Sequence, residues 1–129
     1  MRPKNNIHRL GDLQLRIMKV LWASGEVNVA GVHGAVAGER RLAYTTVATM
    51  LRKMEERGLV SHRLEGRSFL YRATVAEEDV SRSMADALLD RLFEGSMAEM
   101  VRHLLSTREV SRKELSALER LIAERKKAR

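Results

Sequence analysis

Three threonines stand close together in a segment that has the apolar spacing of a helix. Thr45, Thr46 and Thr49 lie in the first turns of a helix predicted over 44–57. Their hydroxyl groups can donate or accept hydrogen bonds, and side chains this short let a helix reach the base edges in the major groove of DNA. The other interpretation is a solvated surface with weak helix caps. Because β-branched residues are unfavourable in a helix, three threonines here favour contact with bases.

Basic side chains follow the threonines. Arg52 and Lys53 lie one to two turns later on the same predicted helix, where they would reach phosphates. Arg67 is at the tip of a hairpin predicted over 59–72. A tip arginine suits a phosphate or a narrow minor groove, and it equally suits an ordinary polar turn. We assign two more arginines of the hairpin to the same DNA-binding surface, Arg63 and Arg72.

Three helices and the hairpin are expected to position these side chains. Apolar residues at helical spacing predict a first helix over 12–23, and Asn28 is a good N-cap for a short second helix. Gly58 suits the position that ends the third helix. Two β-prone runs around a short glycine-containing loop predict the hairpin. The expected fold class is therefore mostly α with a small β-hairpin, in the order of a winged helix-turn-helix domain.

The second half of the chain is predicted to be nearly continuous helix, because residues 76–129 contain one glycine and no proline. Apolar stripes indicate helices over 77–94, 97–105 and 110–122. These segments are short and no large domain covers them, which favours a dimer over a closed bundle within one chain. We therefore predict a winged-helix DNA-binding domain over 1–75 and a helical dimerisation domain after it. The residues that we assign to dimerisation are Val80, Met84, Leu88, Leu92, Met100, Leu104, Leu115, Leu118, Leu121 and Ile122.

Composition favours some partners and excludes several kinds of site. The 24 Lys and Arg residues against 17 Asp and Glu residues give a net charge of +7, which favours nucleic acid first and an anionic membrane second. The absence of cysteine removes disulfides and thiolate metal sites, and the four histidines lack ligand spacing, so we predict no metal and no cofactor. No phosphate loop, nucleophile elbow or carboxylate pair indicates an enzyme. Apolar runs are too short to span a bilayer and no signal segment is present, so we predict a cytoplasmic protein without membrane insertion.

Six short motifs occur in order along almost the whole chain. The similarity to which they belong covers about residues 10–124, and their order and spacing together are specific, although none is specific alone. They lie at 10–13 and 20–22 in the first predicted helix, at 43–47 and 58–60 around the third, at 69–71 in the hairpin and at 92–96 before the short helix. In this arrangement the chain resembles the BlaI/MecI/CopY family of bacterial repressors, also called the penicillinase repressor family.

The resemblance implies a homodimer with winged-helix heads and an interlocked helical C-terminal part, bound to a palindromic operator. Members of this family repress antibiotic-resistance or copper-homeostasis genes. By position, the base-reading residues of the family fall on Thr45, Thr46, Ala48 and Thr49. Ala48 replaces a basic residue of the best-known β-lactam members, so the operator sequence does not transfer. The copper branch uses a C-terminal cysteine hook, which this chain lacks.

The resemblance also implies a way to release the repressor from DNA. In the β-lactam members a membrane sensor metallopeptidase cuts the short helix at an Asn-Phe bond. The corresponding pair here is His103 and Leu104, and we expect Leu104 to be buried. We therefore predict a sequence-specific transcriptional repressor of resistance or stress genes that is released by proteolysis.

Two other functions stay open at this point. A regulator of the MarR type would hold a small molecule between head and dimer helices, and its operator affinity would change with that ligand. A winged helix used as a protein-docking module would show no salt-sensitive DNA binding. The surface of threonines and arginines argues against the docking module.

Overall fold

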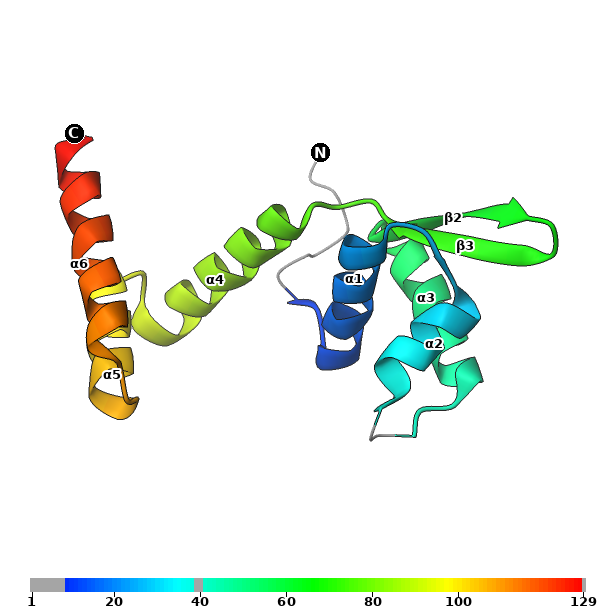
Figure 1. Ribbon diagram of the computed structural model, residues 1–129, viewed down its shortest axis with the longest axis horizontal. Helices are drawn as coiled ribbons and strands as arrows, with labels where there is room; N and C mark the ends of the chain where they lie inside the picture. Colours follow the sequence, from blue (N-terminus) through cyan, green and yellow to red (C-terminus); the bar gives the residue numbers. More distant parts are fainter. Residues whose placement is uncertain (1–8, 39–40, 129) are drawn as a thin grey trace. The chain divides into compact units, whose positions relative to one another are not determined.

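The computed structural model describes residues 9–38 and 41–128, which are mostly helical with one small sheet (Figure 1). The chain divides into two units, one up to Ala87 and the other from Leu88 onward, and the division falls within a helix instead of before it. The predicted fold class is confirmed. In chain order the elements are α1 (Asp12–Ser24), β1 (Val27–Asn28), α2 (Val29–Ala37), α3 (Tyr44–Glu56), β2 (Val60–Glu65), β3 (Ser68–Ala73), α4 (Glu77–Phe93), α5 (Met97–Thr107) and α6 (Arg112–Lys127).

The core of the first unit is formed by the apolar faces of α1, α2 and α3. Residues three or four positions apart lie on one face of a helix, and here those positions carry large apolar side chains. Their burial removes nearly all of their surface from water, which is the main force that holds the three helices together. The buried residues are Leu10, Ile17, Met18, Leu21, Val32, Val36, Val47, Leu51, Met54, Leu59, Val60, Tyr71 and Val80.

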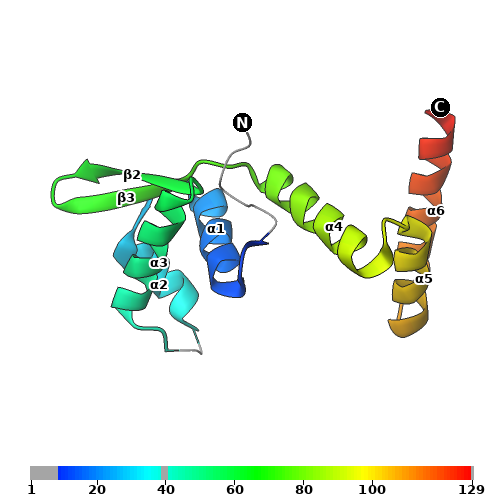
Figure 2. The same cartoon turned by 180° about the vertical axis from the view of Figure 1, so that it is seen from behind.

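The sheet has three antiparallel strands in the order β1-β3-β2. Strands β2 and β3 form the predicted hairpin, paired from Val60 opposite Ala73 to Glu65 opposite Ser68. Figure 2 shows this hairpin extending past the helices of the first unit. The sequence analysis does not predict β1, which pairs Val27 with Tyr71, because two residues are too few to show an alternating pattern. We call the β2–β3 hairpin the wing.

A glycine turns the chain from α3 into the wing. Gly58 has φ of +79°, a conformation that suits a residue without a Cβ atom. Its N–H donates to the carbonyl of Glu55, and the N–H of Leu59 donates to the carbonyl of Met54. These two bonds form a Schellman motif, which satisfies carbonyls at the end of the helix. The predicted end of α3 at Gly58 is confirmed, as is the N-cap of α2, where Asn28 accepts from the N–H of Gly31 at 2.7 Å.

The start of α4 belongs to the core of the first unit. The indole N–H of Trp22 donates to the carbonyl of Val75 at 2.9 Å and ties α1 to the segment before α4. Val80 is 1% exposed within the single chain, and Met84 packs against the same core. The assignment of Val80 to dimerisation is therefore corrected, because its side chain has no surface left for a partner. Met84 likewise packs on the first unit.

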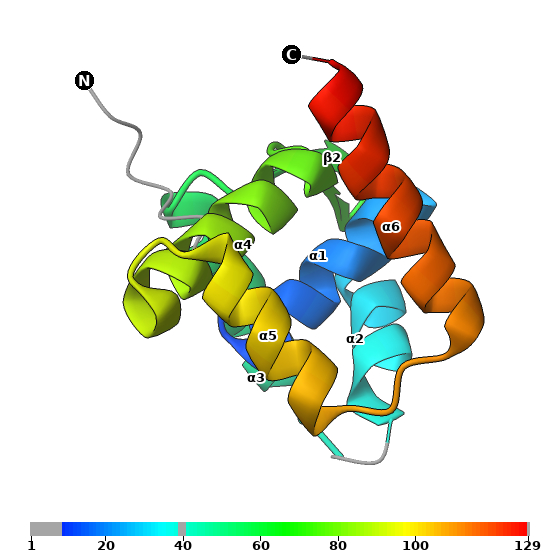
Figure 3. The ribbon, with the colours of Figure 1, turned by 90° about the vertical axis from the view of Figure 1, so that its left-hand side faces the viewer.

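The second unit contains two capped helices without a buried core of their own. The hydroxyl of Ser96 accepts from the N–H of Glu99 at the start of α5, and that of Ser111 accepts from the N–H of Glu114 at the start of α6. Figure 3 shows the chain turning back between these two helices. No residue of α5 or α6 is buried in the described chain. Within residues 9–38 and 41–128, no helix is both long and apolar enough to cross a membrane.

Two glycines of α2 give a matched test of this packing. A Cβ atom at Gly31 would lie 2.6 Å from Cγ1 of Val27 and 3.1 Å from Oδ1 of Asn28, whereas one at Gly34 would meet nothing within 4 Å. Val27 is β-branched and paired in β1, so it cannot move aside freely. We expect Gly31→Ala to lower the free energy of unfolding by about 1–3 kcal/mol. Gly34→Ala should raise it by about 0.5–1 kcal/mol. Denaturant unfolding of both variants measures this, and equal effects would contradict the packing described.

Candidate nucleic-acid interface

The three threonines of α3 lie on the side of the helix that faces solvent. Thr45 and Thr46 are exposed and Thr49 is half-buried, whereas Val47 and Leu51 on the opposite side have no exposure. The N-cap of α3 is Ala43, and no side chain caps this helix. The threonines therefore do not serve as helix caps. Ala48, placed on the same surface by resemblance, is half-buried.

A histidine of α2 fixes the start of α3. Nε2 of His33 lies 2.7 Å from the carbonyl oxygen of Leu42, and because a carbonyl only accepts, the ring nitrogen donates. The ring also meets Tyr44, the first residue of α3, edge-on with centroids 5.9 Å apart. Sequence reasoning misses this role, because His33 stands in no motif and its partner is a backbone atom. These two contacts hold the first turn of α3, which carries the threonines, against α2.

One cavity is lined by side chains from both the tip of the wing and the start of α3. This cavity of about 290 Å³ opens where α2, α3 and the wing meet, and Arg67 and Tyr44 are both in its wall. The basic residues of α3, Arg52 and Lys53, are exposed. The structure thus brings the predicted arginine of the wing to the helix that carries the threonines. The cavity is lined by Asn28, Val29, Ala30, Tyr44, Arg67, Ser68 and Phe69.

One predicted arginine of the wing has a structural partner instead. Arg63 donates two hydrogen bonds of 2.8 Å to the carboxylate of Glu26 and one of 3.2 Å to Glu65. The hydrogen bond from Arg63 lowers the pKa of Glu26, and the charges of Arg63 and Arg72 lower it further. Arg63 on β2 is opposite Leu70 on β3, so the pair with Glu26 reaches across the sheet toward β1. We therefore leave Arg63 out of the DNA contact surface.

The core side of the wing is fixed by Tyr71, which is 4% exposed and belongs to the core cluster of the first unit. Burial raises the pKa of Tyr71, the charge of Glu55 raises it further and the charge of Arg52 opposes the change. Both charged groups belong to α3, so the base of the wing lies against that helix. Within the described ranges, no three His, Asp or Glu side chains come together as a metal ligand set would.

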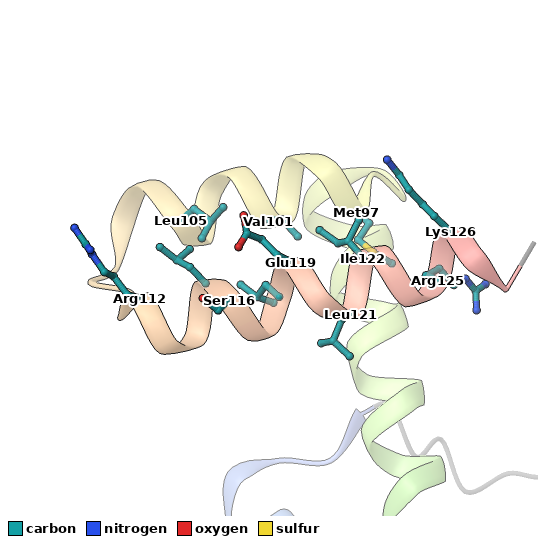
Figure 4. Close-up of a pocket in the computed structure, with 12 residues that line it drawn as sticks. Met97, Val101, Leu105, Arg112, Ser116, Glu119, Leu121, Ile122, Arg125 and Lys126 are labelled. Atoms are coloured by element: carbon teal, nitrogen blue, oxygen red, sulfur yellow. The ribbon is translucent and has the colours of Figure 1, made fainter.

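A second candidate surface lies between α5 and α6. Figure 4 shows Val101, Leu105 and Ile122 between these two helices, which enclose a groove of about 760 Å³. Leu104, expected to be buried, is 40% exposed in the single chain, and that expectation is corrected. Of the residues assigned to dimerisation, Met100 and Leu118 are half-buried, and the exposed ones are Leu88, Leu92, Leu104, Leu115, Leu121 and Ile122.

Nearly the whole chain is similar to known proteins. A family model described as the penicillinase repressor matches residues 10–124. The chain is 28% identical to the penicillinase repressor of Bacillus licheniformis over 120 residues, which cover 93% of this chain and 94% of that protein. It is 35% identical to the transcriptional regulator BlaI of Mycobacterium tuberculosis over 118 residues, which cover 90% and 84% of the two proteins.

A solved structure supports the same assignment for the first unit. The solution structure of the DNA-binding domain of the repressor BlaI matches with a TM-score of 0.51 and 30% identity, covering 57% of this chain and 90% of that domain. The resemblance predicted from the sequence is confirmed: the chain belongs to the penicillinase repressor family of DNA-binding transcriptional regulators.

Proposed function

We propose that the protein is a homodimeric repressor that places α3 in the major groove of a palindromic operator. The observation that carries this proposal is the division of α3 into two faces. One face is fully buried, and the other presents Thr45, Thr46 and the half-buried Ala48 and Thr49 to solvent. Short hydroxyl-bearing side chains read base edges, and the exposed Arg52, Lys53, Arg67 and Arg72 bind phosphates around them. Because its proposed ligand is DNA, we place the repressor in the cytoplasm.

Removal of the threonines and removal of the wing arginine should affect DNA binding differently. Thr46→Ala or Thr49→Ala should weaken binding to the operator by about 1–3 kcal/mol and leave binding to random DNA nearly unchanged. Arg67→Ala should weaken both and reduce the salt dependence by roughly one unit of slope. The measurement is a titration of each variant on a duplex selected by the protein from a random pool and on random duplex, at several salt concentrations.

Arg63→Ala is the matched control for the wing. Its guanidinium is already paired with Glu26, so its removal should change the salt slope much less than removal of Arg67. Equal losses on operator and random DNA for the threonine variants would contradict base reading. Binding that does not depend on salt would instead favour a protein-docking module.

The apolar groove of the second unit supports assembly of two copies. Leu121 and Ile122 are 61% and 58% exposed, and the groove beside them is lined mainly by aliphatic side chains. Large exposed apolar patches mark sites that bind a protein, a membrane or a ligand, and we assign this one to a second copy of the chain. A two-fold dimer would present the two heads to half-sites about one helical turn, or a multiple of it, apart.

A charge placed in the groove should separate the copies. Ile122→Glu puts a carboxylate in the groove wall, and an unpaired buried charge is strongly unfavourable in an interface. We expect it to shift the full-length protein from dimer to monomer at micromolar concentration and to weaken operator binding, because the second head loses its raised effective concentration. Ala117→Glu adds the same charge on the same helix outside the groove, and it should stay dimeric. Analytical ultracentrifugation decides, and a monomeric wild-type protein would refute the dimer.

Release from the operator is proposed to follow cleavage of α5 by a membrane sensor metallopeptidase. A cut between His103 and Leu104 would separate α6 from the rest of the chain. Most of the residues that line the groove belong to α6 and would be lost with it. The remaining apolar area would then have to sustain the dimer alone, and a weaker dimer occupies its operator less at the same concentration. The bond lies within a helix, so the protease must wait for local opening.

Cleavage should be visible in the native host. After exposure to cell-wall antibiotics, we expect the full-length repressor to be replaced by a fragment that ends within α5, before the target genes are transcribed. Immunoblotting beside transcript measurement tests this order, with other stresses as controls. An intact full-length band while the genes are switched on would rule out proteolysis and favour a small-molecule ligand of the MarR type.

A further inference from the structure

A histidine of the wing is hydrogen-bonded to the last turn of α3. Nδ1 of His62 on β2 lies 2.7 Å and 2.9 Å from the two carboxylate oxygens of Glu55. A carboxylate only accepts, so Nδ1 carries the proton and donates. The two side chains are 30% and 31% exposed, so water screens this contact only in part.

The other side of the same ring is held by the wing. The ring of His62 stacks on Phe69 with centroids 4.3 Å apart and planes 26° apart. It also lies against Tyr71, 5.3 Å away. Tyr71 is opposite His62 in the strand register, and Phe69 is the diagonal neighbour on the same face of the hairpin. His62 therefore joins α3 to both strands of the wing.

This contact lies where the wing leaves the core. Exposure along β2 rises from Val60, which is 2% exposed, to Leu64, which is 62% exposed, and His62 stands between them on the same face. Beyond it, Phe69 lines the cavity that Arg67 and Tyr44 share. A change in the direction of the wing at His62 would thus move Arg67 relative to the threonines of α3.

We propose that His62 is a positioning residue for sequence-specific DNA binding, because its hydrogen bond to Glu55 fixes the angle between α3 and the wing. This inference rests on the proposed function. Specific binding needs base contacts from α3 and a phosphate contact from the wing in one register. Binding to random DNA depends mainly on the number of phosphate contacts, which tolerates a looser wing. We call the hydrogen bond between His62 and Glu55 the bridge. Its loss should therefore lower the ratio of operator affinity to random-DNA affinity.

Two substitutions separate the halves of the bridge. His62→Phe keeps an aromatic ring against Phe69 and removes the N–H, whereas His62→Asn keeps an N–H near the position of Nδ1 and removes the ring. In full-length protein, we expect His62→Phe to lower operator affinity about tenfold, as for loss of a hydrogen bond to a charged group, with random DNA nearly unaffected. His62→Asn should retain most of the ratio.

Glu55→Ala removes the acceptor at a half-buried position of α3, and alanine has the highest helix propensity. The lost negative charge should strengthen binding to both DNAs, so the ratio of the two affinities is the quantity to compare. Glu55→Ala should lower this ratio as His62→Phe does, and the double variant should lower it no further, since both changes break the same interaction.

The measurements are titrations on the selected duplex and on random duplex, with thermal unfolding of each variant. An unchanged ratio in both His62→Phe and Glu55→Ala would overturn the inference. So would equal losses on the two DNAs that follow a lowered unfolding temperature, since that pattern indicates a structural role only. The wild-type protein and Thr46→Ala are run in parallel. A wild type that does not discriminate overturns the proposed function itself, whereas discrimination lost in Thr46→Ala but kept in the bridge variants overturns the bridge alone.

Discussion

Burial of one face of α3 is the constraint on which the proposed DNA-binding surface depends. Val47, Leu51 and Met54 have no exposure, so the helix cannot rotate about its axis without taking apolar surface into water. Each residue of a helix is turned about 100° from the one before it, so fixing this face also fixes where Thr45, Thr46, Arg52 and Lys53 point. The hydrogen bond from His33 to Leu42 then sets where the helix begins along its axis. The threonines are thus positioned by the buried face of their own helix and by a hydrogen bond from α2.

The two units depend on packing in opposite ways. In the first unit the chain covers its own apolar faces, and the wing is attached through Gly58, Tyr71 and His62. In the second unit α5 and α6 are 11 and 16 residues long and bury no side chain in the described chain. Isolated helices of that length are marginal in water even with good caps, and most helical stability in proteins comes from a packed apolar face. The caps at Ser96 and Ser111 satisfy backbone groups at the helix starts, but they do not provide a packed apolar face.

Charge in the wing cannot be interpreted from the count of arginines alone. Arg63 and Arg67 lie four positions apart on the same hairpin, yet one is paired with Glu26 and the other lies at the exposed tip. Glu26 is 37 positions from Arg63 in the chain, and the two meet only because β1 joins the sheet beside β3. A surface arginine that is already paired gains little from a phosphate, since it must first give up its carboxylate. The tip and the exposed side of α3 are therefore the parts of this basic chain best suited to DNA.

The sequence predicts the features that depend on neighbouring residues, and it does not predict contacts between segments that are distant in the chain. Helical spacing, the cap at Asn28 and the turn at Gly58 are local, and each is found where it was predicted. The same spacing shows that Val80 and Leu88 share one side of α4 but not what covers that side. In the structure the first turns of α4 are covered by the core of the first unit, so Val80 is buried while Leu88 is 44% exposed. The strand β1, the pairing of Arg63 and the bridge from His62 to Glu55 likewise join segments whose meeting depends on the fold. A hydrophobic period identifies the face of a helix, and only the fold identifies its neighbour.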